Sequence, residues 1–251
     1  MLLESCVPAA CDGIVADLMT HAGRMRGAGA ILFLAVLAAC SGEESRADAD
    51  WQPSLQADKW DIRYSPGMAE HPRQEETGWR FSFPRYDGAL PCEDHLGPAC
   101  PSVHYVTTRA GGPLRGQSIT MTIEISGAAT FRYRLERSNT CNTPATVRLL
   151  IQRRNDDLTK EFYRWWSNPK ALALRPGEQT VTVPKTPDQW SSVFGKKGEV
   201  AREDFSLALE DAENIGMTFG GGCFFGHGVN VTGGQATFAV TEFSISREDG
   251  N

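Results

Sequence analysis

The sequence lacks the common signatures of catalysis, of zinc binding and of nucleic-acid binding. It contains no Gly-x-Ser-x-Gly turn, no His-Glu-x-x-His helix and no phosphate-binding loop. No Cys-x-x-Cys or paired-histidine spacing indicates a zinc site. The basic residues form no stripe and the formal net charge is −6, which argues against nucleic acid as a partner. These absences favour a binding or structural role, and they leave open an enzyme whose paired carboxylates no motif marks.

The apolar run at residues 28–39 is too short to span a bilayer as a helix, which takes about 20 residues. It follows Arg24 and Arg26 and ends in Leu-Ala-Ala-Cys at Cys40. A charged start, a short apolar middle and a small-residue end are typical of a secretory signal peptide. The Leu-Ala-Ala-Cys ending resembles the lipobox of bacterial lipoproteins. The resemblance implies that Cys40 becomes the lipidated first residue, and Ser41 after it implies sorting to the outer membrane.

This interpretation divides the chain into a signal peptide at residues 1–39, a lipidated cysteine with a polar tether at 40–57, and one domain at 58–251. Acidic residues in the first 24 positions do not suit a signal peptide, so the true start is expected near Met25 or Met19. The expected location is the bacterial cell envelope, with the domain in the periplasm or on the cell surface. The lipid anchor would be the contact with the membrane.

Four of the seven cysteines remain once Cys6, Cys11 and Cys40 are set aside. An even number of cysteines in an exported domain predicts two disulfides. Four cysteines allow three pairings. In the favoured one, the first disulfide closes a short loop and the second connects two loops that are distant in sequence. That pairing is Cys92 with Cys100, and Cys141 with Cys223.

Alternating apolar and polar residues predict a succession of short strands, most clearly at residues 119–125 and 131–135. We expect Gly127 to turn these two runs into a hairpin. Further strands are predicted at residues 79–83, 103–107, 147–151, 162–167, 172–174, 180–183, 215–219 and 236–246, the last with a bulge near Thr241 and Glu242. A capped helix is predicted at 186–194, burying Trp190, Val193 and Phe194, and a second one is favoured at 205–209.

This order of elements predicts an all-β fold, an antiparallel β-sandwich with one or two short helices. Residues 118–246 resemble the jelly-roll modules of the galactose-binding-like and carbohydrate-binding superfamilies. The resemblance rests on the glycine-rich stretch at 215–229 and the closing strand at 238–245. It implies a jelly-roll domain that binds a glycan, and it transfers no catalytic residue.

Two groups of residues are candidates for binding a glycan. Tyr163 and Trp165 would share one strand face as an aromatic platform beside Arg164, although such aromatics can equally belong to a core. His227 and Asn230 would line the rim of the glycine-rich loop at residues 220–234, which can equally be a plain crossover. No cofactor is expected. Carboxylates that could help to bind a structural calcium ion are given turn and capping roles instead: Asp156, Asp157 and Asp188.

The sequence therefore favours an outer-membrane lipoprotein whose jelly-roll domain binds a glycan or a cell-envelope polymer without catalysis. One alternative is a structural lipoprotein that binds an envelope protein, and another is a glycan-active enzyme. Specific retention of a protein, or turnover of a polysaccharide, would distinguish these alternatives.

Overall fold

Strand β6 (Ser118–Tyr133) and strand β13 (Val229–Ile245) pair antiparallel along most of their length and form the centre of the fold. The computed structural model describes residues 51–65, 69–86, 101–114, 116–133, 144–221 and 225–246. Residues 50–251 form one compact unit. Within the described ranges, no helix is long and apolar enough to cross a membrane.

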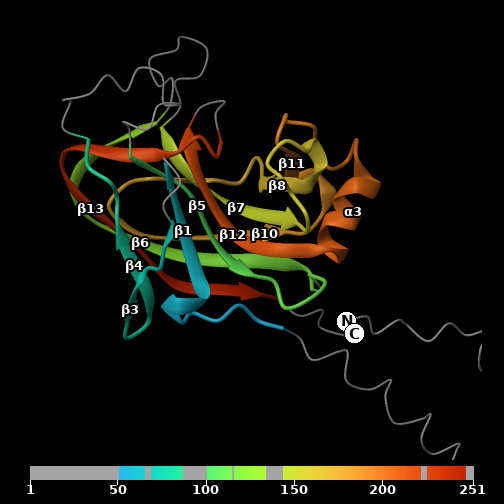
Figure 1. Cartoon of the computed structure of the whole chain (residues 1–251), viewed down its shortest axis with the longest axis horizontal. Helices are drawn as coiled ribbons and strands as arrows, with labels where there is room; N and C mark the ends of the chain where they lie inside the picture. Colours follow the sequence, from blue (N-terminus) through green and yellow to red (C-terminus); the bar gives the residue numbers. More distant parts are fainter. Residues whose placement is uncertain are drawn as a thin grey trace, which may run out of the picture. The chain divides into compact units, whose positions relative to one another are not determined.

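One continuous hydrogen-bonded sheet folds into two layers (Figure 1). Around β6 and β13, layer one contains β10 (Gly177–Pro184), β4 (Gly78–Ser82) and β3 (Arg73–Glu75). Layer two contains β2 (Ala69–Glu70), β1 (Trp60–Ser65), β5 (Ser102–Arg109), β12 (Ala212–Gly221), β7 (Ala145–Arg153), β9 (Leu172–Ala173), β8 (Arg164–Ser167) and β11 (Trp190–Ser192). The layers join where Val229 of β13 pairs with Val103 of β5.

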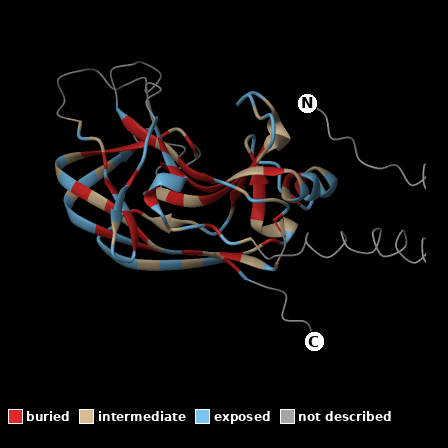
Figure 2. Cartoon of the chain, turned by 60° about the horizontal axis from the view of Figure 1, so that its bottom comes forward, coloured by how far each residue is buried: buried red, intermediate tan, exposed pale blue. Residues whose placement is uncertain are grey.

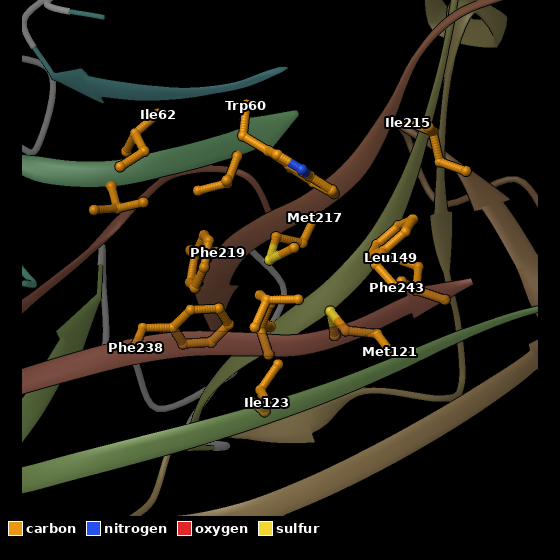
Figure 3. Packing of buried hydrophobic residues seen from close by; sticks show 14 of the residues in the cluster. Trp60, Ile62, Met121, Ile123, Leu149, Ile215, Met217, Phe219, Phe238 and Phe243 are labelled. Atoms are coloured by element: carbon orange, nitrogen blue, oxygen red, sulfur yellow. The ribbon is translucent and has the colours of Figure 1, made fainter. Parts of the chain in front are cut away.

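The core lies between the layers because each strand directs every second side chain inward. Figure 2 shows the buried residues gathered there. Met121, Ile123 and Phe238 of layer one face Met217 and Phe219 of layer two, and all five are almost fully buried (Figure 3). The predicted all-β antiparallel sandwich is confirmed.

Helix α3 (Arg202–Glu210) packs at one end of the sandwich, beside β8 and β11 (Figure 1). Its Phe205 ring lies 5.1 Å from the ring of Trp165 and 6.0 Å from the ring of Trp190. The second predicted helix is therefore confirmed at this place, and it closes the core with aromatic rings.

Two predictions about local structure are wrong. Gly127 does not turn a hairpin: it lies within β6, opposite Ala236, at a φ of 96°. A Cβ there would lie 2.3 Å from the carbonyl oxygen of Gln235, so glycine permits close approach of the neighbouring strand. The expected helix at 186–194 is only the 3₁₀ turn η4 (Pro187–Gln189), followed by β11, and Phe194 is exposed.

The domain also begins earlier than residue 58. The Gln52 side chain bonds the backbone of Ile245 in both directions, at 2.7 and 2.9 Å, and Trp51 packs against the core. The short turn η2 (Ala57–Lys59) then leads into β1. Residues 51–57 therefore belong to the fold, and the expected tether can only precede them. The predicted signal peptide, the predicted lipidation of Cys40 and both predicted disulfides lie outside the described residues.

Candidate functional site

The outer face of layer two, which points away from the core, carries the candidate site. Register places Arg63 of β1 opposite Tyr105 of β5, and Tyr105 opposite Thr218 of β12. On the neighbouring strands, Gln152 of β7 lies opposite Arg164 of β8. Because the intervening residues of these strands point into the core, these side chains share the outer face.

Several side chains on this outer face are buried, although no second sheet of the described residues covers them. Leu150 of β7 is 1% exposed, and its partner Trp166 of β8 is also buried. Two loops cover them. The loop before η3 (Glu161–Tyr163) contributes Leu158, and the loop before β13 contributes Phe225, whose ring lies 5.7 Å from that of Trp166.

Between these loops the face has a shallow depression of about 10 Å³, open to solvent, with room for about one water molecule. It is far smaller than the 300–1,000 Å³ typical of pockets that enclose a drug-sized ligand. It therefore suits one edge of a larger ligand that lies across the face. Its lining residues are Arg63, Tyr105, Thr107, Leu150, Gln152, Leu158 and Arg164.

A hydrogen-bond network fixes the polar side chains around the depression. Arg164 Nε lies 2.8 Å from Asp156 Oδ2, Arg164 Nη1 donates to the Tyr105 hydroxyl at 3.2 Å, and Arg164 Nη2 donates to the Leu158 carbonyl at 2.6 Å. Gln152 Nε2 donates to Asp156 Oδ2 at 2.9 Å. The guanidinium, the amide and the phenol are thus held in place before any ligand arrives.

Burial sets the protonation of two groups on this face. Burial raises the pKa of Tyr105, although Arg164 acts in the opposite direction, so the phenol stays protonated at neutral pH. Burial also lowers the pKa of Arg148 to about 10, which still leaves it charged at neutral pH. The Arg148 guanidinium lies over the ring of Phe225, 3.8 Å from its centroid.

Leu158 at the rim of the depression is both exposed and strained. It is 49% exposed, and its φ of 69° lies in the left-handed region that leucine rarely adopts. Asp156 Oδ1 holds this conformation by accepting a hydrogen bond from the Leu158 amide at 2.9 Å. A strained, exposed apolar residue beside a depression is a feature of binding sites.

The expected aromatic platform of Tyr163 and Trp165 is not formed. Trp165 points into the core against Phe205 and is fully buried, so its ring offers no face to a ligand. Tyr163 lies in the turn η3 before the strand, with Lys160 and Arg153 over its ring. The aromatic strand is shorter than predicted because β8 begins only at Arg164.

The other three predicted ligand-binding residues, Arg164, His227 and Asn230, do not form one site. Arg164 lies at the depression, as described. His227 is half-buried in the loop before β13. Asn230 lies within β13 and is buried, where its Oδ1 finds no hydrogen-bond partner among the described residues. The glycine-rich segment is therefore partly strand, and in its described part Phe225 lies on the outer face against Trp166.

Sequence reasoning missed Arg63, Tyr105, Gln152 and Leu158. One signal was available: Arg148 and Gln152 alternate with the apolar residues of their strand, which marks a half-exposed face. That pattern does not reveal which strands lie next to one another.

The carboxylates that could have suggested calcium have turn and pairing roles instead. Asp157 Oδ1 accepts hydrogen bonds from the amide and hydroxyl of Thr159, which confirms its turn role, and Asp156 pairs with Arg164. Across the described residues, no group of three or more His, Cys, Asp or Glu side chains gathers to hold a metal ion.

Comparison with known proteins gave structural likenesses only. No family model and no curated protein matches the chain. A xylan-binding module, CBM15, matches at 12% identity and a TM-score of 0.37, covering 76% of this chain and 96% of the module. Xylanase 10C from Cellvibrio japonicus, a variant in complex with xylopentaose, matches at 12% identity and a TM-score of 0.38, covering 78% of this chain and 28% of the xylanase. The geometry of the site, and not these likenesses, supports the function proposed for this chain.

Proposed function

We propose that the chain is a glycan-binding domain without catalytic activity, whose ligand lies across the depression on the outer face of layer two. The observation that supports this proposal most is the network that holds Tyr105, Gln152 and Arg164 in fixed positions on a sheet face that no other sheet in the described part of the chain covers. Buried polar groups arranged in this way lower the cost of ordering a binding site.

The chemistry of the depression suits a sugar. Hydroxyl groups need donors and acceptors in fixed positions, and guanidinium, amide and phenol groups supply both. Sugar rings also have apolar faces, which Leu158 at the rim and the Tyr105 ring can cover. The carboxylate of Asp156 is engaged by Arg164 and Gln152, so its role is to position these groups.

A glycan array with the full chain in detergent tests this proposal. Xylan is included because the solved neighbours are a xylan-binding module and a xylanase with xylopentaose. The informative variant is Leu158→Gly, because glycine adopts the left-handed conformation without strain and the fold should be at least as stable. Affinity for a retained glycan should fall about five- to tenfold, as expected for ~1–1.4 kcal/mol of lost apolar contact.

Val200→Gly is the matched control, because Val200 is an exposed apolar loop residue that does not line the depression. It should leave glycan binding unchanged. Binding that survives Leu158→Gly, or a blank array from a cooperatively folded chain, would contradict the proposal. In the second case an envelope protein would become the expected partner.

We also propose that the domain is held on the outer membrane through a lipidated Cys40. The support is the lipobox-like stretch at residues 24–41. Intact mass spectrometry of the membrane fraction should show an acylated chain that begins at Cys40. A soluble chain of unmodified mass would contradict the anchor, while the proposal for glycan binding would stand.

A further inference from the structure

The outer face of layer two has a charge opposite to that of the whole chain. The chain carries a formal net charge of −6. On this face, however, the described strands contribute four arginines and one aspartate, Asp61, and the loop before η3 adds Asp156. The arginines are Arg63, Arg109, Arg148 and Arg164. A local excess of positive charge on an acidic protein attracts an anionic ligand.

Of the two arginines that line the depression, Arg63 and Arg164, Arg63 is the one whose charge is available to a ligand. Arg164 is paired with Asp156 at 2.8 Å, and the Arg148 guanidinium lies over the ring of Phe225. Arg63 is exposed, lines the depression and has no carboxylate within ion-pair distance among the described residues. Its neighbour Asp61 lies 3.5 Å from His71 instead.

A second donor lies directly beside Arg63. Tyr105 is its cross-strand partner, and such partners have Cβ atoms about 4.5–5.5 Å apart. The Tyr105 hydroxyl oxygen already accepts a hydrogen bond from Arg164, and in the described part of the chain nothing accepts its proton. Because burial raises its pKa, the phenol keeps that proton to donate at neutral pH.

We propose that this site selects acidic glycans, with the carboxylate of a uronic acid bound by the Arg63 guanidinium and the Tyr105 hydroxyl. The planar guanidinium matches a carboxylate with two parallel hydrogen bonds, and the phenol supplies a third to the same group. The inference rests on the proposed glycan-binding function and names its ligand class. Leu158 and the Tyr105 ring would contact the sugar ring that bears the acid.

Affinity electrophoresis of the full chain in detergent tests this inference. The probes are polygalacturonate, alginate and glucuronoxylan, each beside its carboxyl-reduced counterpart, with dextran and dextran sulfate for comparison. At least one acidic polysaccharide should retard the chain, and carboxyl reduction should weaken that binding about tenfold or more. Retention should also decline as salt is raised, because the contact is between charges.

The variants assign the effect to the two donors. Arg63→Gln and Tyr105→Phe should each weaken binding of the acidic polysaccharide about five- to tenfold, and should weaken binding of the carboxyl-reduced form by a clearly smaller factor. Arg63→Lys should bind the acidic polysaccharide more tightly than Arg63→Gln but less tightly than the wild type, because lysine keeps the positive charge and cannot form the two parallel hydrogen bonds of the guanidinium. Arg202→Gln removes an equal charge from an exposed position on α3 and should change nothing. Thermal unfolding of each variant confirms that it is folded.

The outcomes separate this inference from the proposal on which it rests. Equal binding before and after carboxyl reduction, lost in Leu158→Gly, would overturn the acid selectivity and keep the glycan site. Retardation by dextran sulfate but by no carboxylated polysaccharide would overturn the carboxylate assignment. Failure to bind any polysaccharide, neutral or acidic, would overturn both.

Discussion

Replacing Asp156 by alanine should destabilise the domain strongly, because it leaves Arg164 buried without its partner. The two side chains are 1% and 7% exposed, and Arg164 Nε lies 2.8 Å from Asp156 Oδ2. Removing one member of a buried ion pair costs about 3–5 kcal/mol. In a domain of this size each kcal/mol shifts the unfolding midpoint by about 2–4 °C. We therefore expect a fall of about 10 °C.

Calorimetry of three variants tests this reasoning. Glu75→Gln is the matched control, since Glu75 and Arg80 also form an ion pair at 2.8 Å but on the surface, where such a pair contributes at most about 1 kcal/mol. Replacing both buried charges, as Asp156→Leu with Arg164→Met, should recover most of the loss because no charge remains unpaired. The reasoning is refuted if Asp156→Ala costs no more than Glu75→Gln, or if the double variant is as unstable as Asp156→Ala.

Four further predictions follow from burial and charge. Trp165→Ala should cost about 3–5 kcal/mol in urea unfolding, because it opens a cavity in the core. Phe194→Ser should change stability by less than about 0.5 kcal/mol, because that ring is exposed. Burial raises the pKa of Tyr64 to about 12. In an alkaline absorbance titration, Tyr64→Phe should therefore remove a late ionisation step. The wild-type fold should lose stability between about pH 10 and 12, because the phenol ionises there in the unfolded chain but not yet in the folded one. Burial alone would raise the pKa of Asp211, but the hydrogen bonds from Arg154 and Arg153 outweigh burial, so the pKa lies below its usual value. Asp211→Asn should therefore destabilise the domain at pH 7, with the difference closing as the pH falls below about 4.

Each of these four has a result that contradicts it. A stable Trp165→Ala variant would place the ring outside the core, and an unstable Phe194→Ser variant would show that the loop is packed. A Tyr64→Phe variant that titrates like the wild type would refute the burial of that phenol. A pH-independent effect of Asp211→Asn would show that its charge makes no contribution.

The sequence predicts the strands well because alternation is a local signal. Ile119 to Ile125 alternate with polar residues and lie on the core side of β6, as expected. The slipped phase near Thr241 predicts a bulge, and the register of β13 shifts between Val240 and Glu242. Such features depend on one strand and its own burial.

The site escapes sequence reasoning because it depends on neighbours that are distant along the chain. Tyr105 and Arg164 are 59 residues apart in sequence, and only the order of β5, β12, β7 and β8 brings them together. In the pattern Phe-Tyr-Arg-Trp-Trp, the first two residues do not alternate between the two faces of the sheet, because the strand begins only at Arg164. Trp165, the predicted platform residue, therefore faces the core, and its neighbour Trp166 faces outward.

Chemical-shift mapping can show whether a glycan binds on the outer face of layer two. The full chain in detergent would be titrated with the oligosaccharide that the array retains best. We expect the largest changes at the amides of Tyr105, Gln152 and Leu158, and none at Thr120 and Thr182, which lie side by side on the outer surface of layer one. Changes confined to layer one, or saturable binding that leaves Tyr105 and Leu158 unmoved, would contradict the account.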